Sequence, residues 1–326
     1  MALADNTPIP IPQGWTLAKN LKVGDYVISW KGKPTKIMSL QTYQPQEMYE
    51  VTLNDGLSFK ADKHTKLPVE TTFDRQNEAL LKHVRPRRKK QRYATINQMM
   101  ETGLYTKRMR KFYAVPNSQP IEFLTEDHPV PPFIVGMWMT NRNKTNVYTI
   151  PEERLDYVKK EIKLVGWSHK MLKNGRLEIR PSIATSFLTR YFSIPTDLPI
   201  EYTFGSMDQR IDLLRGLLAL RPNCYDEKTH RFRIQSDDLK TLQTLQGICE
   251  SLGIKTNAYS RETCFSHVLT FKTNIKLVPN QVYVKRMPAA TRRMVAKIET
   301  IPTKECIHIE TEEPFVVGQG FLPVWH

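Results

Sequence analysis

Six basic side chains stand close enough together to suggest a chemistry, the binding of phosphate. They fall within eight residues and are Arg85, Arg87, Arg88, Lys89, Lys90 and Arg92. Clustered guanidinium and ammonium groups attract polyanions, and the net charge of the whole chain is +15. The cluster therefore predicts contact with the phosphates of double-stranded DNA, without any sequence recognition. The alternative is an ordinary solvated surface that is rich in lysine and arginine.

The cysteines and the hydropathy limit the class of protein. The spacing of the four cysteines includes no Cys-x-x-Cys pair, which argues against a zinc site or a disulfide scaffold. They are Cys224, Cys249, Cys264 and Cys306. No apolar run is long enough to span a bilayer, and no secretory signal stands at the start. We therefore expect a cytoplasmic, monomeric protein with reduced thiols, and two domains because 326 residues exceed what one core normally supports.

The elements that must position any site differ between the ends and the middle. Short alternating runs from Pro8 to about Val69, and again from Val282 to the end, predict strands, with a hairpin turn at Asn54-Asp55-Gly56. The middle predicts helices that alternate with strands. The first expected helix begins at Pro131-Pro132. The others cover 152–165, 181–192, 207–220 and 237–252. The pattern indicates an α+β domain inserted into a β domain whose first and last parts pair.

Both ends resemble the flanking blocks of an intein, a protein-splicing element of the Hint (hedgehog/intein) fold. The matching residues near the start are Thr7-Pro8-Ile9, Gly14-Trp15 and Leu21-Lys22-Val23-Gly24-Asp25, and those at the end run from Phe315 to His326. The resemblance implies a multi-domain protein with an all-β Hint horseshoe formed by residues 1–120 and 282–326. Residues 121–281 would form the insert. The implied function is cis-acting autocatalytic splicing, a single-turnover reaction that needs no cofactor and whose partners are the flanking host segments.

The first residue of an intein supplies the nucleophile, and here that position is Ala2. A methyl group cannot attack the preceding carbonyl, so we expect an inactive or trapped form. Either a cysteine has been replaced, or the chain resembles the inteins that begin with alanine and omit the first acyl shift. Both explanations stay open at this point.

A second block of the family reads Thr-x-x-His, and its histidine protonates the leaving amide. Ala61-Asp62-Lys63-His64 stands at the corresponding place, which makes His64 the expected catalytic acid. A histidine after a strand is also commonly a surface residue. Near the end, the alignment puts His308 at the position that couples the two cleavages, while Cys306 is expected to be a small buried side chain.

The family closes with a histidine followed by an asparagine that cyclises. His326 matches the histidine, and the asparagine does not follow it in this sequence. We therefore expect no carboxy-terminal cleavage from the sequence as it stands.

Two predicted helices of the insert resemble the paired LAGLIDADG helices of homing endonucleases. They are Val135–Asn141 and Leu214–Arg221. In that family an acidic residue at each carboxyl end holds a divalent cation, but Asn141 and Arg221 occupy these positions. The resemblance implies that helix packing is kept, that the metal site is degenerate, and that Mg²⁺ matters only if nuclease activity survives.

Two rival functions remain. The chain could be a basic DNA-binding protein on a β scaffold, or a still-active homing endonuclease. Convergence of Ala2, His64 and His326 would favour splicing, because DNA binding does not require the two ends to meet.

Overall fold

The computed structural model describes residues 2–80, 91–125, 127–141, 147–180, 200–261, 266–285, 291–318 and 320–325. The chain forms two compact units. Unit 1 contains Met1–Glu122, Gly253–Lys255 and Pro288–His326, and unit 2 contains Phe123–Leu252 and Thr256–Met287. Both ends of the chain thus belong to one unit, with the middle of the chain inserted between them. The expected boundaries follow residues 120 and 281, whereas these divisions follow Glu122 and Met287.

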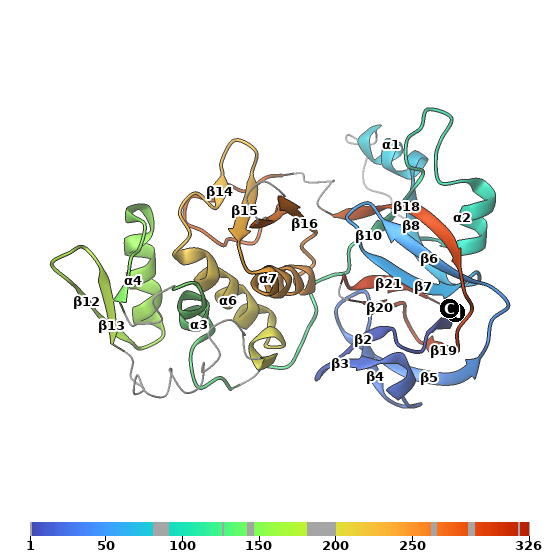
Figure 1. The fold of residues 1–326 in the computed structure, drawn as a ribbon, viewed down its shortest axis with the longest axis horizontal. Helices are drawn as coiled ribbons and strands as arrows, with labels where there is room; N and C mark the ends of the chain where they lie inside the picture. Colours follow the sequence, from blue (N-terminus) through green and yellow to red (C-terminus); the bar gives the residue numbers. More distant parts are fainter. Residues whose placement is uncertain are drawn as a thin grey trace. The chain divides into compact units, whose positions relative to one another are not determined.

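Unit 1 is a β frame with two short helices, which the sequence patterns did not predict (Figure 1). Its main sheet has ten strands in the order β4-β5-β19-β1-β7-β6-β18-β10-β8-β9. The strands are β1 (Ala2–Ala4), β2 (Pro8–Ile11), β3 (Gly14–Leu17), β4 (Tyr26–Ile28), β5 (Pro34–Tyr43), β6 (Met48–Leu53), β7 (Ser58–Asp62), β8 (Lys66–Thr71), β9 (Arg92–Thr95), β10 (Tyr113–Pro116), β18 (Arg292–Ile301), β19 (Cys306–Thr311), β20 (Phe315–Val317) and β21 (Leu322–Val324). The helices are α1 (Thr72–Leu80) and α2 (Ile96–Thr102), with a short 3-10 turn at Ala18–Asn20.

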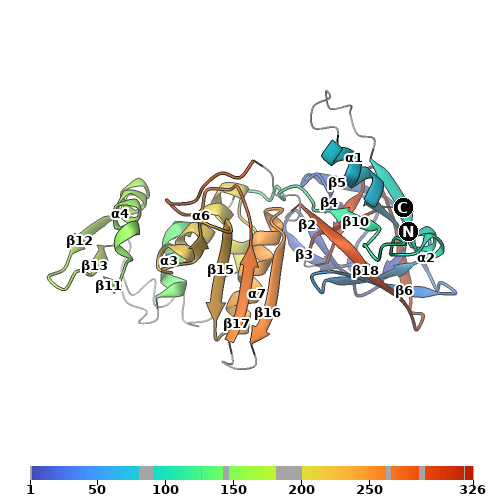
Figure 2. The same cartoon turned by 90° about the horizontal axis from the view of Figure 1, so that it is seen from above.

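The first strand lies inside this sheet rather than at its edge. β1 is antiparallel to β19 on one side and to β7 on the other, so residues from opposite ends of the sequence are neighbours. Side chains alternate across a strand, and Leu3 therefore packs into the main core, while Ala2 and Ala4 face the opposite side. Figure 2 shows the two chain ends side by side.

The hairpin that carries β7 forms where the sequence predicts it. β6 pairs with β7 across Asn54-Asp55-Gly56, and Gly56 takes a φ of 88°, which a side chain would disfavour. Asp55 also forms a buried ion pair of 2.7 Å with Arg293 of β18. The turn therefore fixes the start of β7 against a strand from the last part of the chain.

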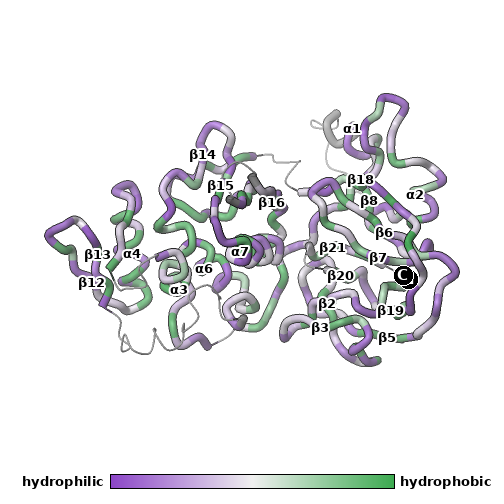
Figure 3. The backbone as a smooth tube through the Cα atoms, in the orientation of Figure 1, coloured by the Kyte–Doolittle hydropathy of each residue, from purple (hydrophilic) through white to green (hydrophobic). Residues whose placement is uncertain are grey.

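Unit 2 is α+β, as the sequence predicts, with one three-stranded and one four-stranded sheet. Figure 3 shows the hydrophobic character of α3, whose residues from Phe133 to Trp138 are all buried. Its helices are α3 (Pro132–Thr140), α4 (Leu155–Leu164), α6 (Met207–Ala219) and α7 (Leu239–Ser251), with 3-10 turns at Glu152–Arg154 and Ile200–Thr203. Its strands are β11 (Val147–Tyr148), β12 (Ser168–Met171), β13 (Leu177–Arg180), β14 (Tyr225–Asp226), β15 (Arg231–Ser236), β16 (Thr256–Arg261) and β17 (Ser266–Phe271).

The helix ends follow their local signals. Asp238 caps α7 by accepting from the amides of Lys240 and Thr241, and Gly253 follows this helix with a φ of 71°. The helix predicted over 181–192 lies outside the described residues. Within the described ranges, no helix is long and apolar enough to cross a membrane.

Candidate functional site

Both the amide and the carbonyl group of Ala2 have a side-chain neighbour. Its side chain is fully buried, and its amide N–H donates to Oδ1 of Asp62 at 3.2 Å. Its carbonyl oxygen lies 3.5 Å from Oγ1 of Thr65. The bond between Met1 and Ala2 is the one that the sequence predicts to be reactive. The structure therefore places a carboxylate against the nitrogen of this bond.

Asp62 collects three hydrogen bonds at the end of β7. Besides the Ala2 amide, it accepts from Oγ1 of Thr65 at 2.6 Å and from the hydroxyl of Tyr43 at 2.6 Å. Burial alone raises the pKa of this carboxyl, but the three donors outweigh it, and the pKa of Asp62 lies below its usual value. Asp62 is consequently a carboxylate at neutral pH, and it accepts protons in hydrogen bonds rather than supplying one.

Tyr43 reaches Asp62 across two intervening strands. It stands on β5, opposite Cys306 of β19, and the next strand toward Asp62 is β1. The residues of β1 on this face are alanines, which leave room for the phenol. Burial first, and then the hydrogen bond to Asp62, raises the pKa of Tyr43 well above its ordinary value, so the phenol stays protonated and donates.

His64, which the sequence pattern selects as the acid, does not reach Ala2. Its side chain is exposed, and none of the described hydrogen bonds joins it to Ala2. The physical reason is local: β7 ends at Asp62, and Lys63 and His64 form the turn before Thr65. The residues brought to Ala2 are therefore Asp62 and Thr65. Asp62 and Thr65 are three residues apart, like the threonine and histidine of Thr-x-x-His. The pair begins one position later than Ala61, where the family pattern aligns.

His308 of β19 is paired with Ala2 of β1. The two residues are direct antiparallel partners, and such partners project to the same face of a sheet with Cβ atoms about 5 Å apart. Its side chain is half-buried. The His308 imidazole thus lies on the same face of the sheet as the Ala2 side chain.

Cys306 is a buried apolar neighbour of this site. It packs with Ala2, Ala4 and Met48, and its Sγ lies 3.5 Å from the Met48 sulfur. Burial, followed by the nearby carboxylates of Asp62 and Asp5, raises the pKa of Cys306 to about 11. The thiol is accordingly protonated at neutral pH, which fits the predicted structural role better than a nucleophilic one.

The last part of the chain joins the same segment. The backbone of Trp325 exchanges two hydrogen bonds with that of Lys66, at 3.0 and 2.8 Å, directly after Thr65. The Trp325 ring also packs against Tyr93, with 4.6 Å between ring centroids. His326 lies outside the described residues. Trp325, the residue before it, is described and pairs with Lys66.

α3 and α6, the two helices that carry the resemblance to the LAGLIDADG pair, cross at Gly136 and Gly216. A Cβ at Gly136 of α3 would lie 2.3 Å from the Leu213 carbonyl oxygen, and one at Gly216 of α6 would lie 2.0 Å from the Phe133 carbonyl oxygen. Only hydrogen atoms fit at this crossing, which is how small residues bring two helices into backbone contact.

Asn141 and Arg221 end these two helices, as predicted. Asn141 is the buried carboxyl-terminal cap of α3, and its side-chain amide donates to the Val147 carbonyl at 3.3 Å. Arg221 follows the cap of α6 and donates to the Gln235 carbonyl at 2.9 Å. Both side chains are thus bound to backbone carbonyls, where the resemblance expects carboxylates.

Comparison with known proteins gives relatives of two kinds, and no protein-family profile matches the chain. The replicative DNA helicase DnaB of Mycobacterium intracellulare is 25% identical over 287 residues, which is 85% of this chain and 48% of that protein. The chain thus spans about half the length of this curated relative. Among solved structures, the MchDnaB-1 intein is 36% identical over 21% of this chain and 54% of its own, with a TM-score of 0.21. The homing endonuclease I-DmoI, in complex with DNA and Mn, is 14% identical over 44% and 88%, with a TM-score of 0.30.

The geometry of unit 1 agrees with the terminal sequence blocks. β1 from the start of the chain and Trp325 from its end both bond to the segment Asp62–Lys66. In its terminal blocks and in the meeting of its two ends, this chain resembles the inteins. Unit 1 carries the residues of that resemblance, and unit 2 is the inserted part of the chain.

The basic cluster of the chain falls mostly outside the described residues. Arg85, Arg87, Arg88, Lys89 and Lys90 lie there, so their predicted contact with DNA stays a prediction. Arg92 is described, and it lies 3.7 Å from Asp74 in a largely exposed ion pair.

Sequence reasoning did not single out Asp62, Thr65 or Tyr43, which the structure groups near Ala2. One signal was present for the first two. Phe59 and Ala61 alternate toward the core, so Asp62 must face the side that carries Ala2. No local pattern identifies Tyr43, because two strands separate it from its partner Asp62 in the sheet.

Proposed function

We propose that this intein is a cis-acting, autocatalytic splicing element whose amino-terminal reaction centre consists of Ala2, Asp62, Thr65 and His308. The observation that carries the proposal is the hydrogen bond from the buried Ala2 amide to Asp62, in a strand that lies between β19 and β7. The nitrogen of this amide is the leaving group when the bond before Ala2 breaks. A site built around that nitrogen has no evident purpose in a scaffold that only binds DNA.

The residues divide the chemistry between them. The Asp62 carboxylate orients the Ala2 N–H and stabilises the positive charge that grows on the nitrogen as it leaves. Asp62 is ionised at neutral pH, so the proton comes from another group, and His308 on the same face is suited to supply it. Thr65 bonds more closely to Asp62, at 2.6 Å, than to the Ala2 carbonyl at 3.5 Å. Its hydroxyl therefore acts mainly by holding the carboxylate in place.

Ala2 itself leaves this centre without a nucleophile. Its methyl group cannot form the ester or thioester that begins the usual reaction, so we infer that the first acyl shift does not take place here. The chain is then either trapped before the first step or begins from a nucleophile in the flanking segment. The buried wall of Ala4, Met48 and Cys306 is apolar in both cases.

The flanking host segments are proposed to be those of a replicative helicase. This rests on the DnaB relative, with which most of the chain aligns. The coding sequence on either side of the chain tests the point: helicase segments are expected, and segments of an unrelated protein would contradict it.

The insert is proposed to bind duplex DNA without cutting it. The α3–α6 crossing is intact, while Asn141 and Arg221 stand where carboxylates would hold a divalent cation. Incubation of the purified protein with duplex DNA and Mg²⁺ is expected to give binding that weakens steeply with salt, and no nicks. Metal-dependent nicking would show that the active carboxylates lie elsewhere, and salt-insensitive binding would contradict the phosphate contacts.

The amino-terminal centre is tested in a restored precursor. This protein carries Ala2→Cys, an Asn-Cys pair after His326, and folded tags at both ends, and thiol-induced cleavage before position 2 is measured. Asp62→Asn is expected to slow this cleavage by roughly 10²-fold, because preorganised charge at the leaving group is lost. The matched control is His64→Ala, which removes an exposed side chain one turn away and is expected to change the rate by less than about twofold.

The opposite ranking of these variants would refute the assignment. If His64→Ala abolishes cleavage and Asp62→Asn leaves it unchanged, the exposed histidine is the acid after all. Cleavage at the carboxyl end serves as the folding control, since it uses His326 and is expected to persist in both variants.

A further inference from the structure

A second surface of unit 1 combines cations with exposed aromatic rings. It is a groove of about 550 Å³ between α1 and the loop that precedes β10. Phe73 on α1 is 65% exposed and Tyr105 on the loop is 45% exposed, values that are high for rings of this size. Lys107, Arg108 and Arg110 complete the walls. Among the residues that the structure describes, no acidic side chain lines this groove.

The loop that carries the cations is ordered by its own hydrogen bonds. Tyr105 pairs with Lys111, the Thr106 amide donates to the Arg110 carbonyl at 2.8 Å, and the Met109 amide donates back to Thr106 at 2.9 Å. Met109 adopts a left-handed φ of 55° at the bend. The side chains of Lys107, Arg108 and Arg110 are therefore displayed from a preformed turn.

Arg75 joins the two walls of the groove. Its guanidinium donates to the Lys111 carbonyl at 2.7 Å and to the Phe112 carbonyl at 3.2 Å, while the Glu70 carbonyl accepts from it at 2.7 Å. One side chain of α1 thus holds the returning strand of the loop in place. The groove is part of the folded frame and requires no rearrangement to exist.

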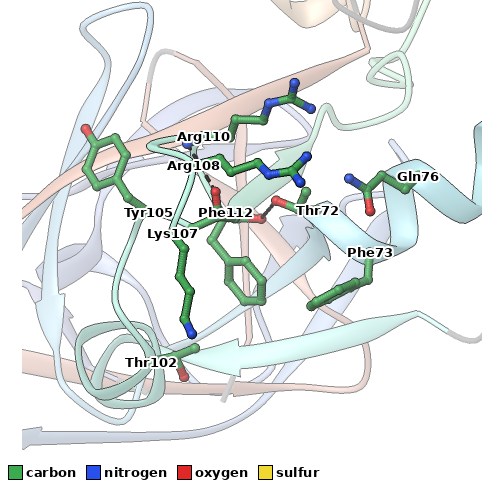
Figure 4. Close-up of a pocket in the computed structure, with 10 residues that line it drawn as sticks. Thr72, Phe73, Gln76, Thr102, Tyr105, Lys107, Arg108, Arg110 and Phe112 are labelled. Carbon is green, nitrogen blue, oxygen red and sulfur yellow. Dashed lines mark hydrogen bonds between the residues drawn. The ribbon is translucent and has the colours of Figure 1, made fainter.

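Two aromatic rings of the groove lie between its cationic groups. In Figure 4 the rings of Phe73 and Phe112 lie next to each other, with the guanidinium groups of Arg108 and Arg110 to one side and the ammonium of Lys107 to the other. The two rings meet edge to face, with 6.1 Å between their centroids. Among the described residues, no ion pair engages Lys107, Arg108 or Arg110 with a carboxylate.

We propose that this groove binds single-stranded nucleic acid, with a base stacked on Phe73 and phosphates held by Lys107, Arg108 and Arg110. A single nucleic-acid strand offers a base and a phosphate at each nucleotide. Stacking of a base on an aromatic ring is largely independent of sequence. A duplex supplies phosphates as well, but its base faces are covered by their neighbours. The exposed ring is what distinguishes the two forms. This site lies in the β frame, so it does not depend on splicing or on the insert.

The test measures binding of the full chain to a fluorescent oligothymidylate and to a duplex of the same length, by anisotropy. Phe73→Leu keeps an apolar side chain but removes the ring. It is expected to weaken single-strand binding by about fivefold or more, and duplex binding by less than about twofold. Tyr26→Leu is the matched control, because Tyr26 is an exposed ring of the same unit on β4, outside the groove. It is expected to have no effect on either probe.

The charges are tested through the salt dependence. In Arg108→Ala/Arg110→Ala the log–log slope for the single strand is expected to fall by about 1.4, since each phosphate contact contributes about 0.7. Lys33→Ala/Lys36→Ala removes two exposed cations elsewhere in unit 1 and is expected to leave this slope within error. Thermal unfolding confirms that each variant is folded.

Two results would overturn the proposal. One is equal loss of single-strand affinity in Phe73→Leu and Tyr26→Leu, which would mean that the ring in the groove is not a contact. The other is tighter binding of the duplex than of the single strand together with no effect of Phe73→Leu, which would leave only a general attraction of a basic surface for phosphates.

Discussion

Replacing Asp62 by alanine should loosen the first strand of the chain by a predictable amount. The carboxylate accepts from three donors, but these differ in what they can do once it is gone. Tyr43 is 37% exposed, so its hydroxyl can turn to water, and the Thr65 hydroxyl can turn to the Ala2 carbonyl. The Ala2 amide is fully buried and has no such choice. An unsatisfied buried donor costs about 1–3 kcal/mol, and this single amide therefore sets the expected loss.

Hydrogen exchange followed by mass spectrometry measures this loss where it arises. In Asp62→Ala the peptide that contains β1 is expected to exchange about 5- to 150-fold faster than in the unmodified chain, which is the same 1–3 kcal/mol expressed as an opening equilibrium. His64→Ala is the control and is expected to shift β1 exchange by less than about 0.5 kcal/mol. Equal protection of β1 in the two variants would refute the reasoning, because it would mean that Asp62 does not hold the Ala2 amide.

Three further predictions concern pH, packing and thiol reactivity. The pKa of Asp62 is lowered in the folded state, so its stabilising contribution is present above its ordinary pKa and is lost as the pH falls through the folded value. Asp62→Asn should consequently flatten the acid limb of the thermal stability profile, and an unchanged limb would contradict this. Gly136→Ala should destabilise unit 2 by about 1–3 kcal/mol in urea unfolding, because its Cβ would meet backbone at 2.3 Å. Gly247→Ala, with nothing within 4 Å, should instead stabilise by about 0.5–1 kcal/mol, and similar effects of the two would count against the tight crossing. Cys306, fully buried with its pKa raised to about 11, should resist iodoacetamide at pH 8 until the chain is unfolded, and rapid alkylation of the native protein would disagree with its buried position.

The sequence was most informative where a local signal decides the structure. The Asp-Gly turn specifies the β6–β7 hairpin, Asp238 specifies the start of α7, and the small residues of α3 and α6 specify a close crossing. The helix α2 also had a signal, which was overlooked. Thr95 and Gln98 form a capping box at its start, and this pattern is readable from the sequence.

The structure places His64 differently from what the sequence spacing predicts, because its position depends on a turn. A search for histidine favours His64, but a displacement of one residue at the end of a strand sends a side chain to the opposite face. The turn at Lys63–His64 points His64 to solvent and leaves Asp62 and Thr65 at Ala2. Tyr43 was unpredictable for a different reason, since its bond to Asp62 depends on the order of strands that are distant in sequence.

The most direct test of splicing is ligation in the restored precursor. That protein carries Ala2→Cys, an added Asn-Cys pair after His326 and a folded tag at each end, and mass spectrometry identifies its products. We predict that the two tags are joined by a peptide bond and that the intein is released. If folded protein gives no ligation and no cleavage at either end, this absence of products would contradict the conclusion that the two ends of this chain form one splicing site.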